Sequence, residues 1–464
     1  MDVLLNRDFG WDTREFCGLR VHGRGDAGAI EALAGVLAGS SVTGIDAAAQ
    51  AARAARGHFA AIVEAPGFIA ACVDHCRSIP VFFTANGVSN DAHLLKQHGG
   101  LERVDDVSVL EAAMAGFVTG PYTLYQGLSQ LQAGEVLWHD RRRAGTTVRQ
   151  YYVYLPDELK AGDEAALLSR LETATDRAIS RVVANANGRP VWVALSAGLD
   201  SRLILCKLVE QGCPNLLAFT YGPSGNDEAR AAREIAGRLG VPWRFWPSSR
   251  QHMRKLFDEP DRERYWAYGD GLCALPNLQD FPTLHRLKTE GEIPEGVVVV
   301  NGQTGDFISG GHIPRLLRER DQSTSGDLFA AIVAKHYSLW RSLKTPANLD
   351  RLRERVWSEL GVRDGENFTR DNACALYERF EYQERQAKHI INGQRNYDFL
   401  GLDWALPLWD RDFVDFWRGV PYEQKFEQRL YRRMLDGWNF AGLFRGYRPV
   451  VWQWPGAMKA VLPV

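Results

Sequence analysis

An apolar run that breaks into a loop of small residues constrains the fold more than any other feature of this chain. Residues 191–201 read V-W-V-A-L-S-A-G-L-D-S, and the helical pattern L-I-L-C-K-L-V-E comes next. Because Ser196, Ala197 and Gly198 lack bulk, the backbone of the loop can approach an anion closely. A helix that begins here offers free N–H groups and the positive end of its dipole to the same anion. The segment therefore predicts a strand, a phosphate-binding loop and a helix.

The end of this loop offers ligands for a metal ion on the phosphates. Asp200 supplies a carboxylate, the kind of oxygen ligand that magnesium prefers. We expect Ser196, Gly198 and Ser201 to hold phosphate, together with the backbone of Ala197. An ordinary strand-to-helix turn also uses Gly, Asp and Ser as turn and capping residues, and that alternative stays open for the loop taken alone. The loop is not a Walker loop, because no Gly-Lys-Ser or Gly-Lys-Thr follows it.

Composition bounds the class of protein. The 464 residues are 45% hydrophobic and 24% charged, which is typical of a soluble globular protein of two or three domains. A formal net charge of −2 gives no reason to bind nucleic acid or an acidic membrane. The seven cysteines lack C-x-x-C pairs and favour a reducing cytoplasm over a disulfide framework. No signal peptide is evident, and no apolar run approaches the roughly 20 residues that span a bilayer.

The rhythm of the expected elements divides the chain into two domains. Up to about residue 155 the segments are short and β-rich, whereas from residue 163 onward helices alternate with single strands. We expect an α+β domain of two packed antiparallel sheets at 1–155 and an α/β domain with a parallel sheet at 163–464. Strands are expected at 57–63, 71–74, 80–84, 191–195, 216–221, 243–246 and 295–301, two more within 123–138, and helices at 164–184, 201–211 and 227–239.

A second glycine-rich loop follows a second buried strand. Ligands of an open parallel sheet bind beyond the carboxyl ends of its strands, so the residues just after each strand are the informative ones. Residues 301–312 read N-G-Q-T-G-D-F-I-S-G-G-H, a loop that can wrap an anion, and Asp306 supplies a second carboxylate to magnesium. The glycines expected at the phosphates are Gly302, Gly305, Gly310 and Gly311. Leu195 and Thr220 are expected to frame the adenosine. A flexible surface loop is the alternative for this segment alone, whereas two separated phosphate loops suit release of pyrophosphate.

Taken together, these segments resemble asparagine synthetases and their relatives. S-A-G-L-D-S is similar to the S-G-G-x-D-S loop of ATP pyrophosphatase domains, with Ala197 in place of the first Gly. Two further segments follow in the order that is typical of the family, first N-D-E-A-R-A-A-R-E-I-A-G-R-L-G and then G-x-x-G-D-x-x-x-G-G. Residues 402–410 resemble the family's S-x-E-x-R-x-P-F-L-D segment, and residues 420–425 its L-P-x-x-x-K. Residues 73–80 resemble the R-D-R-x-G-x-x-P pattern of its glutaminase domain. The resemblance implies an adenine nucleotide alpha hydrolase-like (PP-loop) fold after an Ntn-hydrolase-like domain.

The first domain departs from the family in its nucleophile. A glutaminase of this type needs Cys as its first mature residue, because the thiolate attacks and the free α-amine assists proton transfer. Residue 2 is Asp, and Cys17 lies in the apolar segment E-F-C-G-L-R-V, where we expect it to pack as a small hydrophobic side chain. A degenerate amidotransferase domain without glutaminase activity is therefore expected.

The second domain departs from the family at its catalytic positions, which the resemblance assigns to Gln303, Asp403 and Lys425. Gln303 stands where asparagine synthetases carry Glu and β-lactam synthetases carry Tyr, and an amide cannot accept a proton near neutral pH. Asp403 aligns with the family's functional Glu and leads the candidates for the proton acceptor. Lys425 aligns with a lysine that stabilises charge on the reacting group. The other candidates for an acid or base are Tyr377, Glu378, Glu381, His312 and His389.

The sequence thus predicts an ATP-dependent carbon–nitrogen ligase that forms AMP. Magnesium and ATP would activate a small-molecule or peptide carboxylate as an acyl-adenylate, pyrophosphate would leave, and ammonia or an amine would attack. The identity of the acid, the source of the nitrogen and the oligomeric state stay open, with a homodimer among the alternatives. An intramolecular cyclase of the β-lactam synthetase or lasso peptide cyclase type is the close alternative. A tRNA-modifying pyrophosphatase-domain enzyme and a non-catalytic nucleotide-binding protein are alternatives from other classes.

Overall fold

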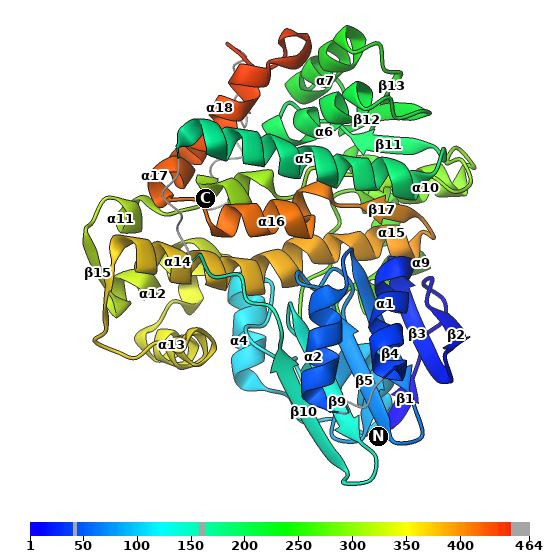
Figure 1. Cartoon of the computed structure of the whole chain (residues 1–464), viewed down its shortest axis with the longest axis vertical. Coiled ribbons are helices and arrows are strands. Elements are labelled where there is room, and N and C mark those ends of the chain that lie inside the picture. Colours follow the sequence, from blue (N-terminus) through cyan, green and yellow to red (C-terminus); the bar gives the residue numbers. More distant parts are fainter. Residues whose placement is uncertain (40–43, 157–162, 447–464) are drawn as a thin grey trace. The chain divides into compact units, whose positions relative to one another are not determined.

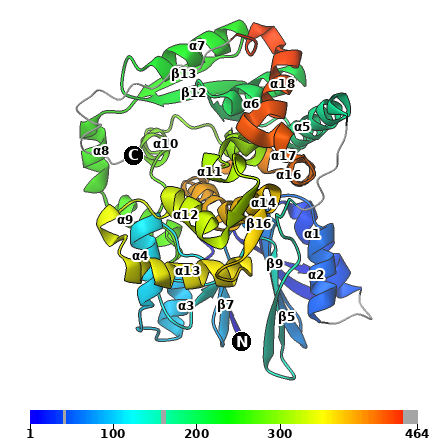
Figure 2. The same cartoon turned by 90° about the vertical axis from the view of Figure 1, so that its left-hand side faces the viewer.

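The structure is a computed structural model of the chain, and it describes residues 1–39, 44–156 and 163–446. The chain forms two compact units, each assembled from three segments. Unit 1 comprises residues 1–155, 263–277 and 314–401, and unit 2 comprises residues 156–262, 278–313 and 402–464. Figures 1 and 2 show the helices and strands of both from two directions.

Unit 2 is built around a parallel five-stranded sheet, which confirms the predicted parallel sheet. Its strands are β11 (Val191–Ala194), β12 (Leu216–Gly222), β13 (Trp243–Pro247), β14 (Val298–Val300) and β17 (Asp403–Ala405). Their order is β13-β12-β11-β14-β17, so the chain adds two strands on one side of β11 and then two on the other. Ligands of open α/β sheets bind at the carboxyl ends of the strands where the strand order reverses. Here that position lies between β11 and β14, the strands that precede the two predicted loops.

The centre of the sheet in unit 2 is buried, as expected of a parallel sheet covered on both faces, whereas the edge strands β13 and β17 contain exposed residues. Val193, Phe219 and Val299, from three adjacent strands, expose no surface. The long helix α5 begins after Asp163, whose side chain accepts a hydrogen bond from the Ala165 N–H, and buries one apolar stripe. The helices of unit 2 are α5 (Glu164–Ala186), α6 (Leu199–Glu210), α7 (Asp227–Arg238), α8 (Arg250–Phe257), α10 (Phe281–Thr289), α16 (Arg411–Arg418), α17 (Tyr422–Lys425) and α18 (Arg429–Trp438), with helical turns η1 (Phe307–Gly311), η5 (Pro407–Trp409), η6 (Phe426–Gln428) and η7 (Phe440–Gly442).

Unit 1 contains a six-stranded and a four-stranded sheet. The strands are β1 (Asp2–Leu4), β2 (Asp12–Phe16), β3 (Leu19–Gly25), β4 (Phe59–Glu64), β5 (Phe68–Val73), β6 (Phe82–Phe83), β7 (Gly87–Ser89), β8 (Ser129–Gln130), β9 (Glu135–Asp140) and β10 (Gly145–Gln150). The sheet β10-β9-β5-β4-β3-β2 is antiparallel throughout, whereas the sheet β1-β7-β6-β8 contains one parallel pair, β1 with β7. The predicted antiparallel sheets are confirmed apart from that pair. Helices α1 (Ala27–Ala38) and α2 (Ile45–Ala54) pack on the six-stranded sheet, and α3 (Ala92–His98) and α4 (Asp106–Ala115) complete this part.

The prediction that Cys17 packs as a small hydrophobic side chain is wrong. Cys17 is exposed, and with Gly18 it forms the two-residue turn between β2 and β3. Both residues have positive φ, 50° and 78°, which is the backbone that a tight hairpin turn requires. The apolar residues around Cys17 therefore belong to two antiparallel strands and not to one buried segment.

Residues 263–277 and 314–401 pack with residues 1–155 in unit 1. They form the C-terminal part of α9 (Pro260–Gly269), then α11 (Arg315–Arg318), β15 (Gln322–Thr324), α12 (Ser325–His336), η2 (Arg341–Leu343), α13 (Pro346–Leu360), β16 (Asn367–Thr369), α14 (Arg370–Phe380), η3 (Glu381–Ile390), η4 (Ile391–Gln394) and α15 (Arg395–Phe399). The predicted domains, 1–155 and 163–464, stay a prediction, since compactness groups these segments differently and does not define which of them share a function.

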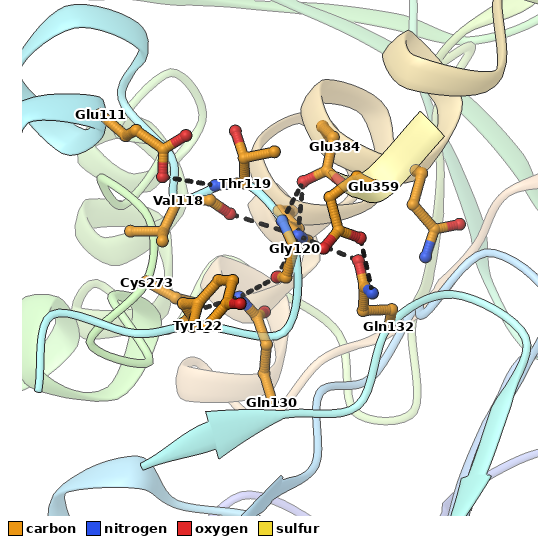
Figure 3. A network of polar contacts seen from close by, with 12 residues as sticks. Glu111, Val118, Thr119, Gly120, Tyr122, Gln130, Gln132, Cys273, Glu359 and Glu384 are labelled. Carbon is orange, nitrogen blue, oxygen red and sulfur yellow. Dashed lines mark hydrogen bonds and ion pairs between the residues drawn. The ribbon is translucent and has the colours of Figure 1, made fainter. Parts of the chain in front are cut away.

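A buried polar network holds these segments of unit 1 together (Figure 3). The Lys388 ammonium lies 2.5 Å from Glu384 Oε2 and donates to the Gly120 carbonyl at 2.6 Å. The Gly120 N–H donates to the same carboxylate oxygen at 3.0 Å, and the Thr119 N–H donates to Glu111 Oε2 at 3.1 Å. Because Lys388 and Glu384 are almost completely buried, losing either partner would leave an uncompensated charge in the interior. The loop at Gly120 is therefore fixed by helix residues that lie more than 260 positions later in the sequence.

No helix among residues 1–39, 44–156 and 163–446 is long and apolar enough to cross a membrane.

Asp74, in the segment that resembles the glutaminase pattern, organises the chain after β5. Its Oδ1 accepts hydrogen bonds from the N–H groups of Cys76 and Ser78, and its Oδ2 accepts from the Phe59 N–H and the Ser78 hydroxyl. Burial acts to raise the pKa of Asp74, but His58, His75 and the Ser78 hydrogen bonds outweigh it and leave the pKa below its usual value. Asp74 therefore stabilises the folded state in its ionised form.

Replacing Asp74 with Asn should lower the free energy of unfolding of unit 1 by about 1–3 kcal/mol at neutral pH, because an NH₂ group would then face buried N–H or O–H donors. Since the folded pKa lies below the unfolded value of about 3.9, the stabilisation by Asp74 is present above that value and is lost as the pH falls through the folded pKa. Urea unfolding of wild type and Asp74→Asn at several pH values should show the difference shrinking below about pH 4. Asp8→Asn, on an exposed residue, is the control; a constant difference down to pH 2 would contradict the role of Asp74.

Candidate active site

The loop after β11 is folded by its own serines. The Ser201 hydroxyl accepts a hydrogen bond from the Ser196 N–H at 3.1 Å and lies 3.0 Å from Ser196 Oγ, which in turn accepts from the Gly198 N–H at 3.1 Å. Gly198 is the N-terminal capping residue of α6, and no side chain caps that helix. The first N–H groups of α6 are therefore available to an anion. The predicted strand, loop and helix are confirmed at this position.

Thr220 and Leu195 are joined at the start of this loop. The Thr220 hydroxyl donates to the Leu195 carbonyl at 2.7 Å and accepts from the Trp243 indole N–H at 3.2 Å. Both residues are buried. The hydroxyl that was expected to frame adenosine is thus engaged with the backbone of the loop, and Thr220 contributes to the position of the loop.

The second loop approaches the first so closely that glycine is required. A Cβ on Gly302 would lie 2.8 Å from the Ser201 nitrogen, and a Cβ on Gly305 would overlap the Asp200 carboxylate. Gly310, with a φ of 96°, packs against the backbone of Lys425, and a Cβ on Gly311 would lie 2.8 Å from the Asp306 carbonyl oxygen. These contacts explain why four positions of the loop carry no side chain.

Asp200 and Asp306 are brought together by a direct hydrogen bond. The Asp306 N–H donates to Asp200 Oδ2 at 3.0 Å, and the Tyr431 hydroxyl donates to Asp200 Oδ1 at 2.8 Å. The Asp306 carboxylate accepts from the Phe307 N–H at 2.8 Å and lies 3.0 Å from His312 Nε2. Both aspartates and the phosphate-loop residues therefore meet at the predicted edge of the sheet.

The electrostatics of this pair favour a bound cation. Burial and the neighbouring Asp306 carboxylate raise the pKa of Asp200 to about 7. A divalent cation would lower the cost of ionising both groups, and carboxylate oxygens are the ligands that magnesium prefers. Thr304 Oγ1, on the same loop, is buried and has no hydrogen-bond partner among the residues that the structure describes. The residues present thus fit a magnesium ion with a polyphosphate. The magnesium ion would offer positive charge to the aspartates, and the phosphate oxygens would accept hydrogen bonds from N–H and O–H groups.

Gln303 belongs to the second loop, and Lys425 lies close to it. Gln303 is half-buried, between Gly302 and Thr304. Lys425, at the end of α17, is fully buried, and its ammonium lies 5.3 Å from the centre of the Tyr422 ring. The geometry thus brings two of the three predicted catalytic residues to the site, although their catalytic roles stay predictions.

Asp403 is not brought to the site. It is the first residue of β17 and lies beside Val298, the first residue of β14, whereas the glycine-rich loop leaves the other end of β14. Its carboxylate lies 2.5 Å from the Arg189 guanidinium, before the start of β11. Asp403 is therefore at the amino end of the parallel sheet, and we withdraw it as the candidate proton acceptor.

The structure adds residues that the sequence did not single out. Besides Tyr431, Gln428 donates to the Ser309 hydroxyl at 2.8 Å and so fixes the second loop. Arg202 is fully buried and donates to the Ala197 carbonyl at 3.0 Å and to the Leu443 carbonyl at 2.5 Å. The local sequence does not reveal the contacts of Tyr431 with Asp200, of Gln428 with Ser309 or of Arg202 with Leu443, because each of them joins residues more than 100 positions apart. His312, which the sequence offered as an acid or base, lies at hydrogen-bond distance from Asp306.

Comparison with known proteins identifies the family. The asparagine synthase family model matches residues 170–437, more than half of the chain, and the chain belongs to this family. No curated protein matches.

Two solved structures show a weak similarity. One is a glutamine phosphoribosylpyrophosphate amidotransferase from B. subtilis complexed with ADP and GMP, at 11% identity and a TM-score of 0.20, with 61% of each chain covered. The other is described as the allosteric regulatory enzyme of purine biosynthesis, at 12% identity and a TM-score of 0.21, with 62% of this chain and 56% of that chain covered. The chain thus spans less than two thirds of the length of either protein.

Replacing Gly305 with Ala should weaken binding of magnesium and ATP by at least about ten-fold, equivalent to 1.4 kcal/mol, because the new methyl group would displace the Asp200 carboxylate. Gly437→Ala is the matched control, since a Cβ at that helix position meets nothing within 4 Å. Isothermal titration calorimetry with ATP and magnesium measures both variants. Equal affinity of Gly305→Ala and wild type would contradict the close approach of the two loops.

Proposed function

We propose that this protein is an ATP-dependent amide ligase that forms AMP. One observation carries the proposal: Asp200 and Asp306, on two phosphate-type loops, meet at the reversal of strand order in the parallel sheet. Membership of the asparagine synthase family supports the same activity. The family also supports a PP-loop, adenine nucleotide alpha hydrolase-like fold for the parallel-sheet region. The similarity of residues 73–80 to the glutaminase pattern supports an Ntn-hydrolase-like fold for the antiparallel sheets.

In the proposed reaction, a substrate carboxylate oxygen bonds to the α-phosphorus of ATP and the bond to the pyrophosphate oxygen breaks. Ammonia or an amine then bonds to the acyl carbon, the bond to AMP breaks, and a proton is released. Bound magnesium supplies positive charge that the phosphate oxygens need during this displacement. The carboxylate itself is a poor electrophile, so the protein must position it and screen its charge.

The residues of the site have separable roles in this proposal. The N–H groups at the start of α6 and the serine hydroxyls of its loop bind phosphate oxygens. Asp200 and Asp306 hold the metal ion, and Tyr431 orients Asp200 through its hydroxyl. Lys425 is the proposed stabiliser of charge on the reacting group. Gln303 is proposed to bind the incoming amine by hydrogen bonds without accepting a proton from it. His312 takes over from Asp403 as a proposed proton acceptor, because it lies at the second loop.

We propose that the antiparallel part of the protein has no glutaminase activity. Asp2 stands in β1, where its N–H donates to the Asn86 carbonyl and its carboxylate lies 3.2 Å from His98 Nε2. Burial raises the pKa of the Cys76 thiol, and that of Cys72, so that neither favours a thiolate. The nitrogen would therefore be taken up as ammonia or as an amine. The cysteines are free thiols, in keeping with the proposed cytoplasmic location.

A cyclase is the second candidate, in which the amine and the carboxylate belong to one substrate. Gln303 favours a cyclase, because position 303 offers no carboxylate to accept a proton. In a cyclase the site needs to deprotonate only one amine, which the substrate itself holds in position. A non-catalytic nucleotide-binding protein would have no need for two adjoining aspartates.

Replacing Asp200 or Asp306 with Asn should each lower ATP–pyrophosphate exchange by at least about 100-fold, because each removes a fixed charge at the phosphates. Exchange of labelled pyrophosphate into ATP, across a panel of carboxylic acids, measures the effect. Asp436→Asn, an exposed substitution in the same unit, should keep wild-type exchange. Both aspartate variants should fold at least as stably as wild type without metal, since each relieves repulsion between like charges. Near-normal exchange in both variants would overturn the two-aspartate site.

The purified protein should release no glutamate from glutamine, yet should form AMP when ammonium salts or amines are supplied with a suitable acid. Enzymatic detection of glutamate, with chromatography of AMP in the same samples, gives the result. Glutamate release that thiol alkylation abolishes would contradict the absence of glutaminase activity. AMP formation that depends on glutamine alone would contradict it equally.

A further inference from the structure

Unit 1 carries a second concave site, which is lined by residues of β2 and β3. These two strands form one edge of the six-stranded sheet (Figure 1). The pocket has a volume of about 630 Å³. It is lined by Arg7, Arg14, Arg20, Thr13, His22 and Glu64, among others. That size suits a small-molecule ligand. None of these residues takes part in the phosphate loops of unit 2.

Thr13, His22 and Glu64 form a continuous hydrogen-bonded chain in this pocket. Thr13 Oγ1 lies 2.9 Å from His22 Nδ1, and His22 Nε2 lies 2.9 Å from Glu64 Oε1. The sheet sets this geometry, because Thr13 is paired directly with His22 between β2 and β3, and Glu64 lies two residues from Ile62, the partner of His22 on β4. All three side chains therefore project from the same face of the sheet.

The chemistry of Glu64 fixes the position of one proton. A carboxylate only accepts hydrogen bonds, so His22 carries a hydrogen on Nε2 and donates it to Glu64. In the tautomer that is protonated on Nε2 alone, Nδ1 presents a lone pair to which the Thr13 hydroxyl donates. This is the arrangement of a nucleophile, a base and a group that orients the base. The His22 ring is 3% exposed, whereas Thr13 is exposed toward solvent, so the base is shielded and the nucleophile is accessible.

A second threonine–histidine pair in the same sheet serves as an internal comparison. His139 Nδ1 lies 2.9 Å from Thr146 Oγ1, again as direct partners on adjacent strands, β9 and β10. Within the described residues, no carboxylate is hydrogen-bonded to the other nitrogen of His139, and neither His139 nor Thr146 lines the pocket. The Thr13 pair is thus distinguished from a purely structural pair by Glu64 and by the cavity beside it.

The charge of the pocket indicates the class of substrate. Arg7, Arg14 and Arg20 line it, against the carboxylates of Glu15 and Glu64. Arg20 is paired with Glu15 at 3.2 Å and Arg14 with Asp12 at 3.3 Å, whereas no ion pair involves Arg7 within the described residues. A guanidinium that is free to pair would attract a carboxylate or phosphate on the ligand.

From this geometry we propose that the pocket is an esterase site that hydrolyses carboxylic esters bearing a negatively charged group, with Thr13 as nucleophile and His22 as base. Thr13 Oγ1 bonds to the ester carbonyl carbon while its proton passes to His22 Nδ1. The bond from that carbon to the leaving oxygen then breaks, and the leaving alcohol takes the proton from His22. Water hydrolyses the threonyl ester by the same route, which releases the acid and restores the Thr13 hydroxyl. Arg7 binds the negative group of the substrate.

The test uses the full-length protein with two chromogenic esters, the mono-p-nitrophenyl ester of succinic acid and the neutral p-nitrophenyl acetate. Thr13→Val should lower the rate of nitrophenolate release by at least about 100-fold, the usual scale for loss of nucleophile and base action. Thr13→Ser should keep the hydroxyl and recover the rate to within about ten-fold of wild type. The Thr146→Val variant carries the same substitution in the His139–Thr146 pair, and it should hydrolyse the esters at the wild-type rate. Acid-quenched samples should contain the succinyl group on the peptide that carries Thr13, by mass spectrometry.

The opposite outcomes overturn the proposal. A wild-type rate in Thr13→Val would mean that a surface histidine, and not this site, hydrolyses the esters. Equal losses in Thr13→Val and Thr146→Val would mean that both pairs are structural. Arg7→Gln should raise KM for the succinate ester and leave KM for the acetate ester unchanged. An unchanged ratio of the two KM values would overturn the assignment of a negatively charged substrate. Circular dichroism of each variant tests whether it is folded.

Discussion

The hydrogen bond from the Asp306 N–H to the Asp200 carboxylate is the contact on which the site depends. It joins two loops that leave neighbouring parallel strands, and it brings two like charges close to each other. Burial, together with the neighbouring Asp306 carboxylate, raises the pKa of Asp200, and this shift expresses the cost of that arrangement. Glycine at positions 302 and 305 is a consequence, since any side chain there would enter the space of Asp200 or Ser201. The fold therefore holds a strained electrostatic arrangement that a cation would relieve.

Local patterns predicted the elements that carry this site. The strand at 191–194, the helix at 199–210 and the glycine-rich loop after 298–300 were all evident from runs of apolar and small residues. Asp403 was misplaced because a motif gives the order of residues and not the end of the sheet at which each one stands. Its register with Val298 puts it at the amino edge, and no feature of the segment reveals that register. Tyr431 and Gln428 were missed for the same reason, because their contacts are made across more than 100 residues of chain.

Unit 1 shows that the lengths and alternation of expected helices and strands do not suffice to predict which segments pack together. The helices at 370–390 lie in sequence between β14 and β17, two strands of the parallel sheet, yet Glu384 and Lys388 bury their charges against the backbone of Gly120. A buried ion pair is costly unless every partner is present, so it acts as a specific link between segments that hydrophobicity alone would not distinguish. The hairpin of β2 and β3 was likewise missed, because its turn lies within an apolar run and only the positive φ values of Cys17 and Gly18 mark it.

The contacts of Arg202 determine when the phosphate loop can take its final structure during synthesis of the chain. Its guanidinium binds the carbonyl of Ala197 in the phosphate loop and the carbonyl of Leu443 near the other end of the chain. A ribosome adds about 5–20 residues per second, so the partner at 443 is synthesised many seconds after the loop. The Arg202 guanidinium therefore lacks its Leu443 partner until residue 443 has been synthesised. Nascent chains that end before residue 443 would carry the whole nucleotide motif in their sequence and still lack its finished shape.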